Sequence, residues 1–155
     1  MPCALKISEA ASLAMHAMGL LATGASPALS TKTIATTFAV SEAHLSKVMQ
    51  RLVKVGLLRS VRGPKGGFSL ARRSDDVTLL DVFEAIEGPV EPSGCMFGLE
   101  DCDGKSCILG RVLFDANQML LTHLSTTNLK SISGVFEDRG FMVQLRSAGK
   151  DAPEG

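Results

Sequence analysis

The sequence predicts a mainly α-helical fold with one small β-hairpin, and three observations support that class. Apolar residues recur every three or four positions along several segments, which is typical of amphipathic helices. A glycine-rich turn over 62–66 separates two short apolar runs, as in a hairpin. The chain has 155 residues, 45% of them hydrophobic and 21% charged, so it can bury a core without disulfide bonds.

Two helices are expected near the N-terminus. The first covers about 6–22, where apolar residues follow helical spacing, and it ends before Gly24. The second is short, begins after Ser30 or Thr31 and ends near Phe38. Both hydroxyl residues can accept a hydrogen bond from the first free N–H groups of a helix, so either is a suitable cap.

The third predicted helix follows a tight turn at 39–40, begins after Ser41 and ends at Val55. Its apolar residues recur at i, i+3, i+4 and i+7 and form one buried stripe, consisting of Leu45, Val48, Met49 and Leu52. The opposite face is small and polar. An amphipathic helix of this kind has one side in the core and the other in solvent.

Two short strands, over 57–61 and 67–70, are expected on either side of the glycine-rich turn. Thr78 and Asp81 then have the spacing of a capping box, which predicts the start of a fourth helix. This helix ends at Gly88, which a proline follows.

A long helix is predicted over 108–126, after an irregular segment at 89–107. Its apolar stripe is wider than packing on one small domain requires, which favours a dimer interface. The stripe consists of Leu109, Leu113, Ala116, Leu120 and Leu124, supplemented by Ile108, Val112 and Met119. With the observations that follow, we expect a winged helix-turn-helix DNA-binding domain at 1–75, a cluster-binding loop and dimerisation helices at 76–134 and a flexible tail at 135–155.

The net charge of zero conceals a strong asymmetry along the chain. Residues 1–73 contain ten Lys and Arg but only two acidic residues, which gives a charge of +8. Residues 74–155 contain six basic and fourteen acidic residues, which gives −8. The basic half is suited to a polyanion such as nucleic acid.

The predicted order of helix, short helix, turn, amphipathic helix and hairpin is that of a winged helix-turn-helix domain. Such a domain inserts its third helix into the major groove of double-stranded DNA. Ser46, Lys47 and Gln50 on the polar face can reach base edges or phosphates. Arg62 and Lys65 at the hairpin turn can approach phosphates or a narrow minor groove.

Two runs of the sequence resemble the Rrf-type family of winged helix-turn-helix transcription regulators, which includes IscR- and NsrR-like iron–sulfur sensors. The run 41–72 is similar to the family's recognition helix and wing, and 77–88 to the segment after the wing. The similarity covers roughly 5–134, and the Arg-Gly-Pro-Lys-Gly-Gly motif at 62–67 is its most specific part.

This resemblance implies a homodimer on a pseudo-palindromic operator. It further implies that Ser41, Ser46 and Lys47 face bases, and that Arg62 enters the minor groove. His44 stands where the family commonly has an aromatic residue, and we include it among the expected DNA contacts.

Cys95, Cys102 and Cys107 have the spacing C-x6-C-x4-C just before the long helix. Clustered thiolates in an irregular segment suit an iron–sulfur cluster. Zinc prefers closer cysteine pairs, and a thiol switch without metal is a third reading. By the resemblance, cluster-binding members of the family have three cysteines in this segment, which implies a [2Fe–2S] or [4Fe–4S] cluster here.

A fourth ligand is needed, and the family resemblance places it on the first helix of the partner subunit in some members. Aligning the N-termini puts His16 at the family's histidine position and Ser12 at its carboxylate position. Imidazole is a better iron ligand than a hydroxyl, so His16 is the candidate. Glu9 and Cys3 are the alternatives.

The sequence thus predicts a DNA-binding regulator that senses redox state, nitric oxide or iron–sulfur supply. A regulator of the same fold with zinc or a thiol switch is the first alternative, and a small iron–sulfur electron-transfer protein the second. The sequence has no catalytic triad pattern or phosphate-binding loop, so we expect no enzyme. The longest apolar stretch, 10–25, is too short and too interrupted to span a membrane, and we expect a cytoplasmic protein.

Overall fold

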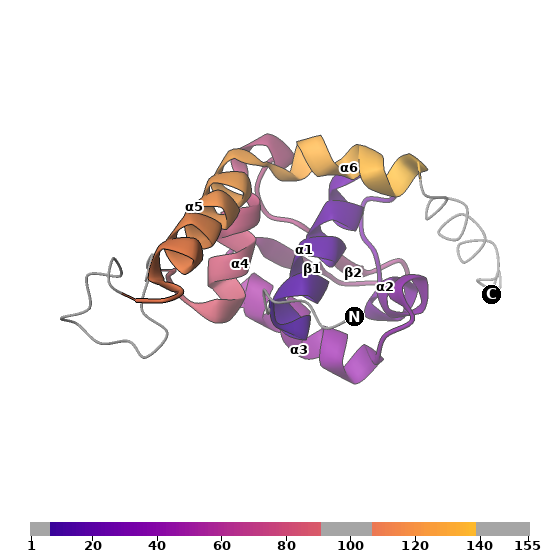
Figure 1. The fold of residues 1–155 in the computed structure, drawn as a ribbon. Coiled ribbons are helices and arrows are strands. Elements are labelled where there is room, and N and C mark those ends of the chain that lie inside the picture. The colour runs from indigo at the N-terminus through magenta and orange to yellow at the C-terminus, as the bar shows by residue number, and fades with distance from the viewer. Residues whose placement is uncertain (1–6, 91–106, 139–155) are drawn as a thin grey trace.

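The computed structural model describes residues 7–90 and 107–138 (Figure 1). It confirms the predicted class, because helices and one two-stranded antiparallel hairpin make up the described fold. The elements are α1 (Glu9–Ala22), α2 (Thr31–Phe38), α3 (Glu42–Lys54), β1 (Leu58–Val61), β2 (Gly67–Leu70), the 3-10 helix η1 (Ser74–Asp76), α4 (Leu79–Glu87), α5 (Gly110–Thr126) and α6 (Leu129–Asp138).

Serine side chains set the start of the first three helices. Ser8, Ser30 and Ser41 each accept a hydrogen bond from a backbone N–H three residues later. The first helix therefore begins at Glu9, later than the predicted start at residue 6, because Ser8 is its N-cap. The two other caps confirm the predictions for α2 and α3.

The turn between α2 and α3 depends on one residue in the left-handed conformation. Ala39 has φ 54° and ψ 44°, and the N–H of Val40 donates to the carbonyl of Ala35 at 3.0 Å. This bond closes the end of α2, so that α3 begins two residues later, after Ser41. The arrangement is a helix-turn-helix.

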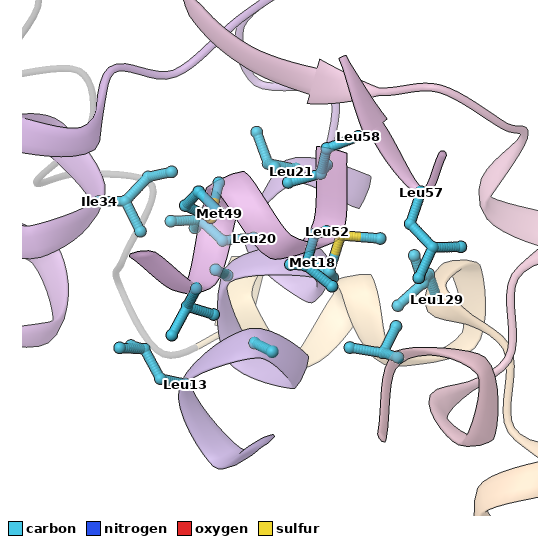
Figure 2. Close-up of a cluster of buried hydrophobic side chains, with 14 of the residues drawn as sticks. Leu13, Met18, Leu20, Leu21, Ile34, Met49, Leu52, Leu57, Leu58 and Leu129 are labelled. Atoms are coloured by element: carbon cyan, nitrogen blue, oxygen red, sulfur yellow. The ribbon is translucent and has the colours of Figure 1, made fainter. Parts of the chain in front are cut away.

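The core lies around α1, which contacts α3, α4 and α6 (Figure 1). All four residues of the predicted stripe on α3 are buried, as expected from their spacing. Figure 2 shows two of them, Met49 and Leu52, beside leucines and a methionine of α1 and the leucines that precede and begin β1. The labelled core residues are Leu13, Met18, Leu20, Leu21, Ile34, Met49, Leu52, Leu57, Leu58 and Leu129.

The hairpin pairs β1 with β2 in a register that runs from Leu58 opposite Leu70 to Val61 opposite Gly67. A third segment joins it, because Leu29 and Phe68 exchange two backbone hydrogen bonds, of 3.0 and 2.8 Å. Gly67 is required at this contact, since a Cβ there would lie 2.2 Å from the carbonyl oxygen of Leu29. The base of the hairpin is thereby fixed to the chain that leads into α2.

The capping box at Thr78 and Asp81 is present, as predicted, with both reciprocal hydrogen bonds. The segment 77–79 also forms backbone hydrogen bonds with the turn between α5 and α6. The N–H of Leu79 donates to the carbonyl of Thr127, and the N–H of Leu129 donates to the carbonyl of Val77, each at 2.9 Å. Two backbone bonds therefore join the start of α4 to the junction of α5 and α6.

The structure adds two observations on α5 and α6 to the sequence prediction. Only Gly110 and Leu124 of α5 are buried, and Leu109 in the predicted stripe is 45% exposed, because α5 packs on α4 along part of its length. Helix α6 extends to Asp138 and crosses the boundary predicted at 134, since Phe136 is buried against α1. The division into three parts stays a prediction.

Candidate nucleic-acid interface

The polar face of α3 points away from the core. Lys47 and Gln50 are exposed and Ser46 is half-buried, whereas the residues between them on the other side are buried. The amide of Gln50 donates to the hydroxyl of Ser46 over a long 3.5 Å. Ser41 is exposed, and its hydroxyl caps the helix by accepting from the N–H of His44. The structure thus brings Ser41, Ser46, Lys47 and Gln50 to one accessible helix.

His44 is placed differently from these four residues. His44 as a whole is half-buried, and its Nε2 atom is buried without a hydrogen-bond partner among the described residues. Helical spacing explains this, because position 44 precedes buried Leu45 and lies one turn before buried Val48. The structure turns this ring nitrogen into the protein, so it offers no exposed donor or acceptor there.

The tip of the hairpin presents two cations on a tight turn. Arg62 and Lys65 are exposed, and neither forms an ion pair with a described residue. The turn is closed by the N–H of Gly66, which donates to the carbonyl of Gly63 at 2.9 Å. A Cβ at Gly66 would lie 2.3 Å from the carbonyl oxygen of Val61, so the turn accepts only glycine there. The tight backbone turn, and not side-chain packing, therefore places Arg62 and Lys65 in solvent.

Sequence reasoning missed a further cation on the hairpin. Arg59 is exposed, and its Nε donates to the hydroxyl of Ser69 at 2.9 Å across the paired strands. This hydrogen bond can be predicted only once the register of β1 and β2 is known, because Arg59 and Ser69 are directly opposite one another. The hairpin therefore presents an oriented guanidinium in addition to Arg62 and Lys65.

Of the three predicted cysteine ligands, only Cys107 lies in the described part of the chain. Its thiol forms no disulfide and is half-buried, and its carbonyl accepts from the N–H of Gly110 at the start of α5. Cys95, Cys102 and Cys3 lie outside the described residues. Within residues 7–90 and 107–138, no three His, Cys, Asp or Glu residues are grouped to hold a metal ion.

His16 lies in an aromatic environment. Its Nδ1 is 2.7 Å from the carbonyl oxygen of Ser12, and its ring contacts Phe38 of α2 and Phe136 of α6 edge to face. Helix α6 and the start of α5, next to Cys107, are at opposite ends of the α5–α6 unit in Figure 1. One subunit alone therefore does not bring His16 and Cys107 together.

Glu9 lies at the end of α1 that contacts the end of α4. It is exposed in the first turn of α1 and follows Ser8, whose hydroxyl donates to the carboxylate of Glu87. Glu87 ends α4, a few residues before the cysteine segment begins. The carboxylate of Glu84 accepts from the N–H of Val90 at 3.1 Å and fixes the described chain just after α4. Ser12 is half-buried.

Large apolar side chains lie in solvent on α5 and just before it. Val112 and Met119 of α5 are 64% and 75% exposed at a spacing of seven, and Ile108, in the turn that precedes the helix, is 97% exposed. An exposed apolar face of this kind on a regular helix marks an interaction surface. Among the residues that the structure describes, no helix is long and apolar enough to cross a membrane.

A charge cluster links η1 to α6. Asp75 accepts a hydrogen bond from the guanidinium of Arg73 at 3.1 Å and lies 3.4 Å from the ammonium of Lys130. Chiefly through the Arg73 bond, these cations lower the pKa of the Asp75 carboxyl below its ordinary value. All three side chains are accessible to solvent, so the cluster is a modest surface contact.

Comparison with known proteins places this arrangement among bacterial regulators. The family model for Rrf2, an iron-dependent transcriptional regulator, matches residues 7–134. The transcriptional regulator NsrR of Geobacillus kaustophilus is 29% identical over 117 residues, which cover 74% of this chain and 77% of NsrR.

Two solved structures are similar in fold. CymR, the global cysteine regulator of B. subtilis, has a TM-score of 0.72 at 29% identity, with 84% of this chain and 98% of CymR covered. IscR of T. potens has a TM-score of 0.64 at 26% identity, with 98% and 95% covered. These relatives are transcriptional regulators, not enzymes.

Proposed function

Since the chain belongs to the Rrf2 family of transcriptional regulators, we propose that it acts as a homodimer on double-stranded operator DNA and senses through an iron–sulfur cluster. One observation carries the DNA part of the proposal. The exposed polar face of α3 and the exposed cations of the hairpin belong to the same basic half of the chain. Family membership argues against an electron-transfer protein.

The residues of α3 and the hairpin divide into base readers and backbone contacts. Ser41, Ser46, Lys47 and Gln50 would lie in the major groove, where hydroxyl, ammonium and amide groups can bond to base edges. Arg62 would enter the minor groove, and Lys65 would contact phosphates. His44 would act from within α3 by shaping its first turn, because its Nε2 is buried.

The homodimer part rests on α5. Val112 and Met119 of α5, and Ile108 in the turn before it, expose apolar surface that one chain leaves uncovered. A second copy of the same face would cover it around a two-fold axis, as in most homodimers. Two α3 helices would then be presented to two operator half-sites.

The cofactor part rests on donor chemistry. Three thiols within thirteen residues suit iron, and Cys107, which forms no disulfide, is available as one of them. Cys95, Cys102 and Cys107 would hold a [2Fe–2S] or [4Fe–4S] cluster, which supplies a group sensitive to redox state and nitric oxide. His16 is exposed beside Phe38 and Phe136 with its Nδ1 facing the carbonyl of Ser12, so Nε2 would be its ligating atom, and Glu9 on the exposed start of α1 is the alternative. The cytoplasm is the compartment where such a regulator meets DNA.

A zinc or thiol regulator is the second candidate, and the similarity to CymR, named a cysteine regulator, favours it. Anaerobic purification followed by iron, acid-labile sulfide and zinc assays separates the two. We expect iron and sulfide in equal amounts, and their loss in Cys107→Ala. Zinc without sulfide, or no metal after reconstitution, would contradict the cluster and leave the DNA part standing.

DNA binding is tested with a duplex selected from a random-sequence pool, by fluorescence anisotropy over a range of salt concentrations. Arg62→Ala should weaken binding and relax selectivity at the minor-groove positions, and Lys65→Ala should lower the slope of log K against log salt by about 1. Lys130→Ala, which removes an exposed cation from α6, is the matched control. Equal losses in all three variants would contradict the assignment of the hairpin.

A further inference from the structure

The exposed side of α3 extends beyond the residues placed in the major groove. Arg51 and Lys54 lie in its last turn, and both are exposed. Lys54 follows buried Leu45 by about two and a half turns, so these two residues lie on opposite sides of the helix. Helix α3 lies along the lower edge of the fold in Figure 1, and this side of it faces solvent.

The two cations form a row with Lys47. Successive members of the row are four and three residues apart, which is the spacing that places side chains on one side of a helix. Lys47 belongs to the polar face already assigned to the major groove. Arg51 and Lys54 therefore continue that face toward the C-terminal end of α3.

The length of α3 decides what its last turn can reach on DNA. Its 13 residues make a helix about 20 Å long, whereas the major groove is about 12 Å wide. A recognition helix contacts base edges mainly with its N-terminal residues. A helix that enters the groove in this way brings its last turn toward the phosphates at the border of the groove.

Neither Arg51 nor Lys54 has an acidic partner in the part of the chain that the structure describes. The ion pairs found there involve Arg73, Arg111 and Lys130, all of which follow the hairpin in the chain. Glu42, the acidic residue of α3, lies at the opposite end of the helix. The charges of Arg51 and Lys54 are thus available to an anion outside the chain.

From this row and its unpaired charge we propose that Arg51 and Lys54 bind operator phosphates that border the major groove. Helix α3 is thereby divided into a base-reading half and a phosphate-binding end. The inference rests on the proposed function, because it needs α3 in the major groove. Phosphates carry no direct sequence information, so the two residues supply affinity and register, and not selectivity.

The variants must separate DNA binding from a role inside the helix. A cation in the last turn also interacts favourably with the partial negative charge of the helix C-terminus. Arg51→Gln and Lys54→Gln are therefore used, since glutamine is neutral and has nearly the same helix propensity. Lys130→Gln removes an exposed charge of the same sign from α6 and is the matched control. The melting temperature of each variant is measured first.

The first experiment measures affinity for the selected duplex and for an unrelated one by fluorescence anisotropy, from about 50 to about 200 mM salt. Each lost phosphate contact should make the slope of log K against log salt shallower by about 0.9, so the affinity lost over this range becomes about 3.5-fold smaller. The double variant should change the slope by about 1.8, and Lys130→Gln should not change it. The ratio of the two affinities should stay within about twofold of wild type.

The second experiment locates each contact on the DNA. A methylphosphonate replaces one charged phosphate at a time with a neutral group along each half-site. Wild-type protein should lose affinity several-fold at the phosphates bound by Arg51 and Lys54. Lys54→Gln should lose nothing further at its own phosphate and keep the loss at that of Arg51, and Arg51→Gln should show the converse.

The outcomes distinguish the inference from the proposed function. An unchanged salt slope in both variants, together with a lower melting temperature or without one, would overturn the inference. So would a reduced affinity ratio at an unchanged slope, which would assign the residues to base contacts, or an equal change of slope in Lys130→Gln. A wild-type protein that binds no selected duplex would overturn the proposed function itself.

Discussion

The region 7–90 and the α5–α6 unit at 107–138 use apolar residues in opposite ways. In the first region α3 buries its whole apolar stripe, and α1 is surrounded by other elements of the same chain. In the second, α5 is the longest helix described, with 17 residues, yet it buries only two of them, and Ile108 just before it is 97% exposed. The second region adds Leu124, Leu129 and Phe136 to the core, but it also leaves large apolar side chains of α5 in solvent.

The largest expected effect is in the first region, for Leu52→Ala. Leu52 is fully buried on α3, so its truncation leaves a cavity in the core and should lower the free energy of unfolding by roughly 2–5 kcal/mol. Urea unfolding followed by circular dichroism measures this change. Val55→Ala, one turn away and 45% exposed, is the control and should stay within about 0.5 kcal/mol of wild type. Similar losses in both variants would contradict a core confined to the buried stripe.

Met119→Glu tests the second region. The side chain is 75% exposed in one chain, so a carboxylate there should leave the fold intact, but it would enter the dimer interface without a partner. We expect the dimer dissociation constant to rise about 30-fold, equivalent to about 2 kcal/mol. Sedimentation equilibrium measures it, with Ser125→Glu on the same helix as control. A dimer as stable as wild type would show that this face of α5 is not the interface.

Thr78→Ala tests the joint between the two regions. Its hydroxyl caps α4, and its backbone pairs with Asn128 at the α5–α6 turn. The substitution removes the cap but leaves the backbone pairing, so the free energy of unfolding should fall by about 1 kcal/mol. Thr78→Ser should restore most of the loss in the same thermal unfolding experiment. A Ser variant no better than Ala would assign the effect to the lost methyl group instead.

The smallest expected effect concerns the pH dependence of the η1–α6 contact. Because Arg73 and Lys130 lower the pKa of Asp75 in the folded protein, its carboxylate stabilises the fold above the pKa of the unfolded chain. That stabilisation is lost as the pH falls below the ordinary value of 3.8 and through the folded pKa. Asp75→Asn should therefore be slightly less stable than wild type at pH 7, and the difference should shrink at pH 2. A difference in melting temperature that is the same at both values would rule this contact out.

Local signals made most of the fold predictable from the sequence. Serine caps, the stripe on α3 and the capping box at Thr78 each act within a few residues, and the structure has all three. Helix α6 had such a signal too, since Asn128 caps it and Leu129, Ile132 and Phe136 follow at helical spacing. A polar composition after residue 137 obscured it.

The candidate site was predictable in part for the same reason. The accessibility of Lys47, Gln50, Arg62 and Lys65 follows from local spacing and from the hairpin turn, while their DNA contacts stay predictions. The surroundings of His16 depend on α6, which lies over a hundred residues later, and no short-range pattern encodes that contact. The pairing of Arg59 with Ser69 likewise needed the strand register.

The backbone pairing of Leu29 with Phe68 has a consequence for how operator preference can change over evolution. Two main-chain hydrogen bonds hold the base of the hairpin against the chain before α2, and main-chain bonds do not depend on the side chains at the tip. Residues 62 and 65 can therefore mutate without moving the hairpin. In the proposed DNA complex, new selectivity would arise there one substitution at a time, while Gly67, against the carbonyl of Leu29, stays fixed.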